Sequence, residues 1–451
     1  MKTGALNSKE INVSMRIDGS FHLSDGVMLE RAIVNHSHKP LIDFCSSIFT
    51  SGRNKRVYTR KEYGYPYLSN SDVVAQNPFD SCNHNSRKYG YDESAFLKEG
   101  MVLTGRVGAI GQTAYVTKEF EEKEAMGSDN IIRIVAKPSE YSGYIYSFLS
   151  SKVGNTLLWK LAAGGVQPYI TDKMVANIPV PIFPESKQQE IHNLIVESAN
   201  LRVEANLLLE EAVALFEKHI DKSKFSFNYQ TKVLKINERN LFSNRLDAQF
   251  AIVQEEIKKE KKNIEYVSIN SIASNIFVGN RAKRNYVEDG IPFLSSSDMM
   301  LFNPIRYAKQ ISKKSPNLDS LQVVKGDILI SRSGTIGNTV LVGNVLSGSA
   351  ISEHALRLVI DRDKMSPEYV YCYLNTQQGK HLMECSAYGS VIITLNEDYV
   401  GNILLPILDK TEMDIIADKM KEHSEKIDDA TIKENQAISL VEQEIESWQQ
   451  S

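Results

Sequence analysis

Two stretches of this chain carry the same unusual pattern: an apolar, partly β-branched run that leads into a loop with several glycines and one arginine. The first reads GMVLTGRVGAIG at residues 100–111, and the second reads GDILISRSGTIG at residues 326–337. Their final glycines, Gly111 and Gly337, are 226 residues apart. One such loop would be weak evidence, but its recurrence at this distance indicates that one module is written twice in the chain.

The repetition extends well beyond these loops. The distance between matching segments drifts only from 229 to 224 residues. The matching segments are the Arg-x-Asp-x-x-Phe openings at Arg16 and Arg245, GYPYLSNSD and GIPFLSSSD at residues 64–72 and 290–298, Ser-Asp-Asn and Ser-Glu-His at residues 128–130 and 352–354, and IPVPI and ILLPI at residues 178–182 and 403–407. Coincidence does not explain this order, so the chain is a tandem duplication whose copies have diverged.

Length and composition are those of a soluble protein with several domains. The 451 residues fit two halves, each with a globular part and a helical tail. No apolar run reaches the length of about 18 residues that a membrane span needs, and residues 1–20 lack the apolar core of a secretory signal. Cys45, Cys82, Cys372 and Cys385 share no close spacing, which favours a reducing, cytoplasmic setting and argues against a structural zinc site.

The helical tails predict a pair of long helices. Residues 186–220 contain no proline or glycine, and their apolar residues follow a heptad, as do those of residues 411–448 with a phase slip near 430–434. At 1.5 Å per residue each helix is about 50 Å long. A narrow apolar stripe needs a partner, and the other tail is the obvious one. The seam residues are Ile191, Leu194, Leu201, Leu208, Leu215, Ile416, Met420, Ile427, Val441 and Trp448.

A loop rich in basic and aromatic residues occurs at the same place in each copy. The first copy holds Arg53, Lys55, Arg56 and Arg60 near Tyr58, with Arg87 and Lys88 further on; the second copy holds Arg281, Lys283 and Arg284. Such loops suit phosphate neutralisation and stacking on bases, whereas the simpler interpretation is a solvated charged loop. Recurrence in both copies favours nucleic acid. Because the formal net charge is −4, the positive charge must be concentrated on one face, with the acids elsewhere.

The arginines of the two glycine loops, Arg106 and Arg332, occupy equivalent positions. Each is a candidate phosphate clamp or guanine reader, or a brace inside its own loop. The glycine spacing is not Gly-x-Gly-x-x-Gly and no Gly-Lys-Ser/Thr follows, which disfavours nucleotide binding. Weaker candidates for DNA contact are Gln167, Ser333, Ser352 and His354.

Two other function classes find less support in the sequence. Asn77-Pro78-Phe79-Asp80 faintly resembles an amino-group methyltransferase motif, but the second proline and a glycine-rich cofactor turn are missing, so we interpret it as a turn. The spacing of Glu121 and Lys123 resembles a nuclease cluster only at background level. A structural adaptor with coiled-coil tails and no nucleic-acid contact remains open, and the net charge favours it slightly.

In its loops, proline exits and following helices, nearly the whole chain resembles the specificity subunit of type I restriction–modification systems. The resemblance implies an α+β fold with two α/β target recognition domains in pseudo-two-fold arrangement, separated by two long helices that pair as an antiparallel coiled coil. We divide the chain into a first recognition domain (1–184), a first helix (185–221), a linker and second recognition domain (222–409), and a second helix (410–451).

The family likeness also implies the function and the partners. A specificity subunit reads an asymmetric, bipartite site in double-stranded DNA, with one half-site per domain, and holds no active centre of its own. It docks two methyltransferase subunits and the restriction or motor subunits, to which S-adenosylmethionine, ATP and Mg²⁺ belong. The openings at Arg16 and Arg245 are similar to those of type IIB and single-chain type IIG enzymes. A type IIB specificity subunit therefore remains an alternative.

Overall fold

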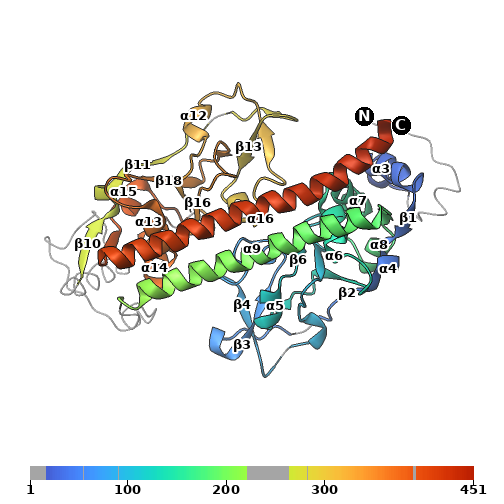
Figure 1. Ribbon diagram of the computed structural model, residues 1–451, viewed down its shortest axis with the longest axis horizontal. Helices are drawn as coiled ribbons and strands as arrows, with labels where there is room; N and C mark the ends of the chain where they lie inside the picture. Colours follow the sequence, from blue (N-terminus) through green and yellow to red (C-terminus); the bar gives the residue numbers. More distant parts are fainter. Residues whose placement is uncertain are drawn as a thin grey trace. The chain divides into compact units, whose positions relative to one another are not determined.

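The computed structural model describes residues 17–53, 55–89, 91–220, 264–281, 283–389 and 393–450. The chain divides into two compact units (Figure 1): unit 1 is Met1–Val203 with Asp429–Ser451, and unit 2 is Glu204–Asp428. Arg16, Arg245 and most of the expected linker lie outside the described residues. The division falls inside both long helices, so each unit contains a piece of each helix.

The strands of unit 1 form a four-stranded antiparallel sheet (β2-β8-β5-β6), a three-stranded sheet (β4-β3-β7) and a short antiparallel pair (β1-β9). Strands β3 and β7 are parallel. The strands are β1 (His38–Pro40), β2 (Cys45–Thr50), β3 (Gly64–Leu68), β4 (Asn83–Ser86), β5 (Val102–Gly105), β6 (Thr113–Tyr115), β7 (Met126–Gly127), β8 (Ile131–Ala136) and β9 (Pro179–Pro181).

The helices of unit 1 are mostly short. They are α2 (Gly19–His22), α3 (Asp25–Val34), α4 (Leu41–Phe44), α5 (Lys118–Glu122), α6 (Ser142–Ser150), α7 (Lys152–Leu161), α8 (Asp172–Ala176) and the first part of α9 (Glu185–Glu217), with 3-10 turns at Lys61–Tyr63 and Glu93–Ala95. Helices α6 and α7, the four-stranded sheet and the adjoining pieces of α9 and α16 (Lys410–Gln450) share one hydrophobic core.

Unit 2 repeats this plan. Its sheets have the orders β11-β18-β15-β16, β12-β14-β13-β17 and β10-β19. The strands are β10 (Glu265–Ser268), β11 (Ala273–Val278), β12 (Tyr286–Val287), β13 (Ile291–Leu294), β14 (Lys309–Ile311), β15 (Ile328–Ser331), β16 (Thr339–Leu341), β17 (Ala350–Ile351), β18 (Ala355–Ile360) and β19 (Leu404–Ile407). The helices are the last part of α9, α11 (Ile269–Ile272), α12 (Leu318–Leu321), α13 (Pro367–Asn375), α14 (Gln377–Ser386), α15 (Glu397–Gly401) and the first part of α16, with a 3-10 turn at Asp298–Met300.

Strand register confirms the tandem duplication. In unit 1, Arg133 of β8 stands opposite Phe49 of β2 and Leu103 of β5. In unit 2, Arg357 of β18 stands opposite Phe277 and Leu329. The bulge between Cys45 and Ser47 is matched by one between Ala273 and Asn275. Two copies of one fold are therefore present, although their loops differ in sequence.

In each copy a short break separates two consecutive helices, α6 from α7 and α13 from α14. The Ser151 hydroxyl accepts a hydrogen bond from the Gly154 N–H (3.1 Å), and Thr376 caps Gly379 in the same way (3.0 Å). A Cβ on Gly154 would lie 2.0 Å from the Phe148 carbonyl oxygen. The glycine therefore lets the next helix pack directly against the end of the previous one.

Within unit 1, the pieces of α9 and α16 run antiparallel. Lys187 pairs with Glu444 at 2.5 Å and Glu197 pairs with Lys433 at 2.8 Å. Next to the second pair, the Ser198 hydroxyl donates to the Ala430 carbonyl (2.7 Å). Among the described helices, none combines the length and low polarity that a membrane crossing requires.

Within unit 2, the other pieces of the same helices also run antiparallel. Lys426 pairs with Glu204 and Lys419 with Glu211, both at 2.6 Å. His423 Nδ1 donates to the Ala205 carbonyl at 2.7 Å. This bond occupies the place in unit 2 that the Ser198 bond occupies in unit 1, because Ser198 and His423 are equivalent in the repeat.

The buried stripe of each helix compares as follows with the predicted seam. In α9, Ile191, Ile195, Ala205, Leu209, Ala212 and Phe216 are buried, whereas Leu194, Leu201, Leu208 and Leu215 are partly buried on its flank. In α16, Ile416, Met420 and Val441 are buried, and Ile427 and Trp448 are partly buried. The apparent phase slip arises because the polar residues His423 and Glu434 occupy buried positions, and the spacing of buried positions continues past them.

The glycine loops yield a stability prediction with a built-in control. Gly108 and Gly111 both have positive φ (77° and 82°), but a Cβ on Gly108 meets nothing within 4 Å, whereas one on Gly111 lies 2.5 Å from Asn155 Nδ2. We expect Gly108→Ala to lower the free energy of unfolding by about 1 kcal/mol, from backbone strain alone. Gly111→Ala should lower it by about 2–4 kcal/mol, because a clash is added. Urea unfolding measures both, and equal losses would contradict the packing of this loop against α7.

Candidate nucleic-acid interface

A Ser-acid-x tripeptide joins the parts of the candidate site in each copy. The Ser128 N–H donates to the Leu68 carbonyl at the end of β3 (2.9 Å), and the Asn130 carbonyl accepts from the Arg106 N–H (2.8 Å). In the second copy, the Ser352 N–H donates to the Leu294 carbonyl (2.9 Å), and the His354 carbonyl accepts from the Arg332 N–H (3.1 Å). The tripeptide therefore ties the sheet that contains β3 in unit 1, or β13 in unit 2, to the glycine loop of the same unit.

In unit 1 a buried arginine donates hydrogen bonds to the turn that carries the tripeptide. The Arg133 guanidinium is fully buried and donates to the carbonyls of Gly127 (2.5 Å), Ile131 (2.9 Å) and Ala95 (3.1 Å). Burial lowers the pKa of Arg133 to about 10. These bonds hold both ends of the turn between β7 and β8, which carries the tripeptide.

The equivalent arginine of the second copy has a different set of partners. Arg357 donates to the Leu321 carbonyl (2.8 Å) and lies 3.6 Å from the Asp327 carboxylate. Its guanidinium also lies over the Phe277 ring, 4.8 Å from the ring centre. Burial lowers the pKa of Arg357, and the neighbouring Asp327 charge partly offsets that effect.

The basic loop of the first copy is held by the acid of the tripeptide. Arg56 donates to the Asp129 carboxylate at 2.7 Å, and Arg53 Nε lies 3.7 Å from its other oxygen. The Arg56 guanidinium also lies over the Tyr67 ring, 5.5 Å from its centre. The hydrogen bond to Asp129 is the main cause that raises the pKa of Arg56.

The second copy reproduces this arrangement with a longer acid. Arg284 donates to the Glu353 carboxylate at 2.7 Å, and Arg281 Nε donates to its other oxygen at 3.2 Å. The Arg284 guanidinium lies 4.7 Å from the centre of the Phe293 ring. Burial acts to raise the pKa of Glu353, but hydrogen bonds from its own backbone N–H and from Arg284 lower it overall.

The other predicted basic residues are more scattered. Arg87 pairs with Glu124 at 2.8 Å and lies over the Tyr65 ring at 4.4 Å, while Lys88 lies 5.3 Å from the Tyr89 ring. Three further residues, Lys55, Arg60 and Lys283, are exposed on the same loops. The structure thus gathers two arginines of each basic loop on one carboxylate and leaves the remaining cations apart.

The glycine-loop arginines take no part in bracing through their side chains. Among the described residues, no hydrogen bond, ion pair or ring contact involves the side chain of Arg106 or Arg332, and both are partly exposed. Their backbones are fixed instead, because the Arg106 carbonyl accepts from the Ile170 N–H and the Arg332 carbonyl from the Leu395 N–H, both at 2.9 Å. Of the interpretations left open by the sequence, an internal brace is therefore the least supported.

The weaker candidates differ in accessibility. Gln167 is exposed on the loop that follows α7, beside the fully exposed Val166. His354 is exposed, and its Nδ1 lies 3.2 Å from the Ser333 hydroxyl. Ser352 is buried, and its hydroxyl has no hydrogen-bond partner among the described residues. Ser352 therefore does not present its side chain to a ligand in this conformation.

Sequence reasoning did not single out the two acids, Asp129 and Glu353. A phosphate-binding loop is expected to be surrounded by positive charge, so the expectation does not point to acidic residues beside it. A signal was present nevertheless, since both belong to the repeated Ser-acid-x tripeptide.

Two smaller motifs are explained by local structure. The Asp18 carboxylate accepts from the Phe21 N–H (3.0 Å) and begins α2, and the Phe21 ring lies 4.5 Å from Lys160 Nζ. The opening motif therefore anchors a turn on α7. At the faint methyltransferase motif, the Asn77 side chain accepts from the Phe79 N–H at 3.2 Å, which is a turn as predicted.

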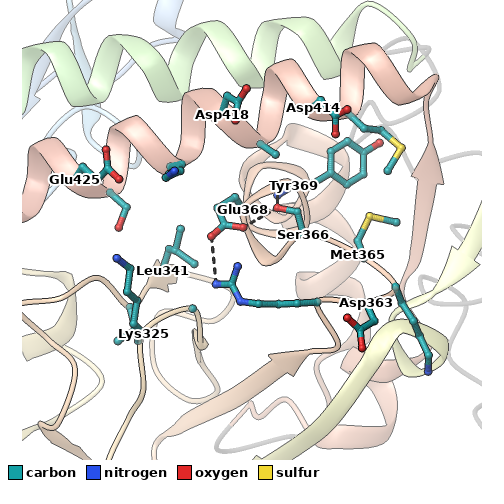
Figure 2. A pocket seen from close by; sticks show the side chains of 18 of the residues that line it. Lys325, Leu341, Asp363, Met365, Ser366, Glu368, Tyr369, Asp414, Asp418 and Glu425 are labelled. Atoms are coloured by element: carbon teal, nitrogen blue, oxygen red, sulfur yellow. Dashed lines mark hydrogen bonds and ion pairs between the residues drawn. The ribbon is translucent and has the colours of Figure 1, made fainter.

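A pocket of about 740 Å³ lies apart from these loops, within unit 2 (Figure 2). Side chains of both charges line it, including Arg362 paired with Glu368 at 3.4 Å, and Asp414, Asp418 and Glu425 of α16. None of the predicted DNA-binding residues lines it. Within the described ranges, no cluster of His, Cys, Asp and Glu has a geometry suited to a metal ion.

Comparison with known families adds one direct match. Residues 41–197 match the model of the type I restriction modification DNA specificity domain. The matched range contains the first basic loop, the first glycine loop, Asp129 and the start of α9. Over residues 41–197 the match confirms the resemblance drawn from the sequence. None of the curated proteins matches the chain.

Solved structures give weaker likenesses. The S subunit of a type I restriction-modification system from M. genitalium is 13% identical; the alignment covers 90% of this chain and 95% of that chain, with a TM-score of 0.38. The HsdS subunit from Thermoanaerobacter tengcongensis is 14% identical, with 91% and 95% coverage and a TM-score of 0.28. Both TM-scores lie below 0.5.

Proposed function

Because residues 41–197 belong to the family of type I restriction modification DNA specificity domains, we propose that this chain is the DNA-reading subunit of a restriction–modification complex. The family match is the observation that carries the proposal. In the second copy the sheet β11-β18-β15-β16 has the strand order and register of β2-β8-β5-β6 in the first. The second copy is therefore proposed as a second domain of the same kind, which gives two half-sites, one per domain.

The half-sites are proposed to differ and to be separated by unread bases. The two copies place different residues on their loops, for example Asn130 against His354, which supports different base preferences. The helices α9 and α16 are proposed to pair as a coiled coil that sets the spacer. The antiparallel ion pairs within each unit support that pairing. The corresponding domain limits are 1–184 and 222–409, with helices at 185–221 and 410–451.

The proposed DNA contacts are the exposed cations of the two loops in each copy. Arg106 and Arg332 are the best candidates, because their guanidinium groups have no partner among the described residues and their backbones are fixed. The basic loops supply further phosphate contacts through Arg53, Arg56, Arg281 and Arg284. Such contacts make affinity depend steeply on salt.

The chain is proposed to contribute recognition while other subunits contribute chemistry. Modification subunits, two per chain, and restriction subunits would bring S-adenosylmethionine, ATP and Mg²⁺ to a complex in the cytoplasm. The specificity family itself is non-catalytic, which fits a chain whose candidate site consists of arginines on carboxylates and aromatic rings.

Selection from a pool of randomised DNA duplexes tests this function. The purified full chain, alone and with its modification subunit, should retain duplexes that share two short defined sequences at one fixed separation. Binding should weaken steeply between low and moderate salt, since phosphate contacts release counterions. Retention without any shared sequence, or a flat salt response, would favour the adaptor interpretation instead.

Substitution of the glycine-loop arginines then assigns each domain to a half-site. Arg332→Ala should weaken binding to the selected duplex by roughly tenfold or more. It should have no effect on a duplex whose second half-site is scrambled, because the lost contact is already absent there. Arg106→Ala is the matched control and should show the same behaviour for the first half-site. Equal losses on duplexes scrambled at either half-site would contradict the assignment.

A further inference from the structure

Each copy holds a pair of arginines on one carboxylate, in nearly the same geometry. In unit 1 the pair is Arg53 and Arg56 on Asp129, at 3.7 and 2.7 Å. In unit 2 the pair is Arg281 and Arg284 on Glu353, at 3.2 and 2.7 Å. The spacing of three residues within each pair is the same, although the loops differ otherwise.

The two arginines of a pair are not equivalent. The inner one, Arg56 or Arg284, donates to the acid at 2.7 Å and lies over an aromatic ring of the adjacent strand. The outer one keeps most of its surface in solvent, with side-chain exposure of 83% for Arg53 and 84% for Arg281. The inner side chain is about half as exposed, 45% for Arg56 and 35% for Arg284, so the outer guanidinium offers more of its N–H groups to a ligand.

The acids are fixed more firmly than an ordinary surface residue. Only 14% of the Asp129 side chain and 17% of the Glu353 side chain are exposed. Asp129 follows Ser128, whose backbone bonds to β3, and the turn that carries it is held by the buried Arg133. The carboxylate is therefore fixed relative to the sheets, and its ion pairs fix the positions of the arginines in turn.

An acid at this position also has an electrostatic cost for DNA binding. A carboxylate beside a phosphate-binding loop repels the phosphates and neutralises part of the positive charge. An exposed ion pair contributes little to folding, so stability alone is a poor reason for the arrangement. Orientation of the arginine pair is the remaining benefit, since a planar guanidinium is useful to a phosphate only at a suitable angle.

We infer that Asp129 and Glu353 are positioning residues for DNA binding, and that Arg53 and Arg281 are the arginines that they present to the phosphate backbone of the two half-sites. This inference rests on the proposed function. Within each basic loop the outer arginine contacts DNA, whereas the inner arginine, Arg56 or Arg284, links the acid to the aromatic ring and helps to hold the acid in place.

Phosphate, rather than a base, is the partner that the two copies favour. The outer arginine occupies the same position in both copies, with the same acid type beneath it and the same exposure. Domains that read different half-sites have no reason to share a base contact, whereas every half-site offers the same backbone.

The test compares Asp129→Asn, Arg53→Ala and Arg53→Lys on the selected duplex and on a duplex with the first half-site scrambled. We expect Asp129→Asn to weaken specific binding roughly tenfold, although it removes a negative charge. Binding to the scrambled duplex should stay equal or become tighter. Arg53→Ala should lower the slope of log K against log salt concentration by about 0.9, and Arg53→Lys should restore it, because a lysine still neutralises one phosphate.

The double variant and the second copy provide the controls. In the Arg53→Ala background, Asp129→Asn should cause little further loss, because the residue that it positions is gone. Glu353→Gln should behave like Asp129→Asn, but only toward the second half-site. Thermal unfolding of each variant separates a folding defect, which would weaken binding to both duplexes and leave the salt slope unchanged.

Three outcomes would overturn the inference. Asp129→Asn could bind the selected duplex as tightly as the unchanged chain, the two substitutions could be fully additive, or Arg53→Ala and Arg53→Lys could both lose preference for one base pair. The last result would make Arg53 a base reader. Absence of DNA binding by the unchanged chain is a different result, and it would overturn the proposed function instead.

Discussion

The buried Arg133 on β8 is the interaction on which the candidate interface of unit 1 depends. Arg133 donates to backbone carbonyls on both sides of the turn between β7 and β8. That turn carries the acid that holds the basic loop and the carbonyl that receives the glycine loop. Because a buried guanidinium can donate to several carbonyls, those carbonyls have hydrogen-bond partners without water. The turn is held in this way although it contains no regular secondary structure.

The two copies show which features of this arrangement tolerate change. Arg357 keeps the place of Arg133 on its strand but takes a carboxylate and an aromatic ring as partners. The acid above it changes from aspartate to glutamate, and the ring under the inner arginine changes from tyrosine to phenylalanine. Both copies therefore keep an arginine, an acid and an aromatic ring at the same positions, although the acid and the ring are different residues.

The sequence predicted the duplication, the long helices and the basic and glycine loops, because each leaves a local or periodic signal. It predicted the buried face of α9 only in part, because four of the predicted leucines lie on the flank, whereas Ile195, Leu209 and Phe216 are buried. Ser198 and His423 bond to carbonyls of the opposite helix segment, so they are buried although they are polar. Hydrophobic periodicity is blind to polar residues that are satisfied in this way.

The acids beneath the basic loops were missed for a related reason. The charged residues from Arg53 to Arg60 and from Arg281 to Arg284 are all cations, and their acidic partners lie 69 to 76 residues further along the chain. No composition or spacing rule connects segments that are so distant. The signal that identifies Asp129 and Glu353 is the repeat itself, because both copies have an acid at the same position beside a basic loop.

The methylation pattern of DNA in cells tests the central claim most directly. The chain is expressed with the methyltransferase subunit of its system, and N6-methyladenine is mapped across the genome by long-read sequencing. The account predicts one bipartite motif with two different half-sites and a fixed gap, which disappears when this chain is omitted. An active methyltransferase that gives no motif, or the same motif without this chain, would contradict the assignment of sequence recognition to it.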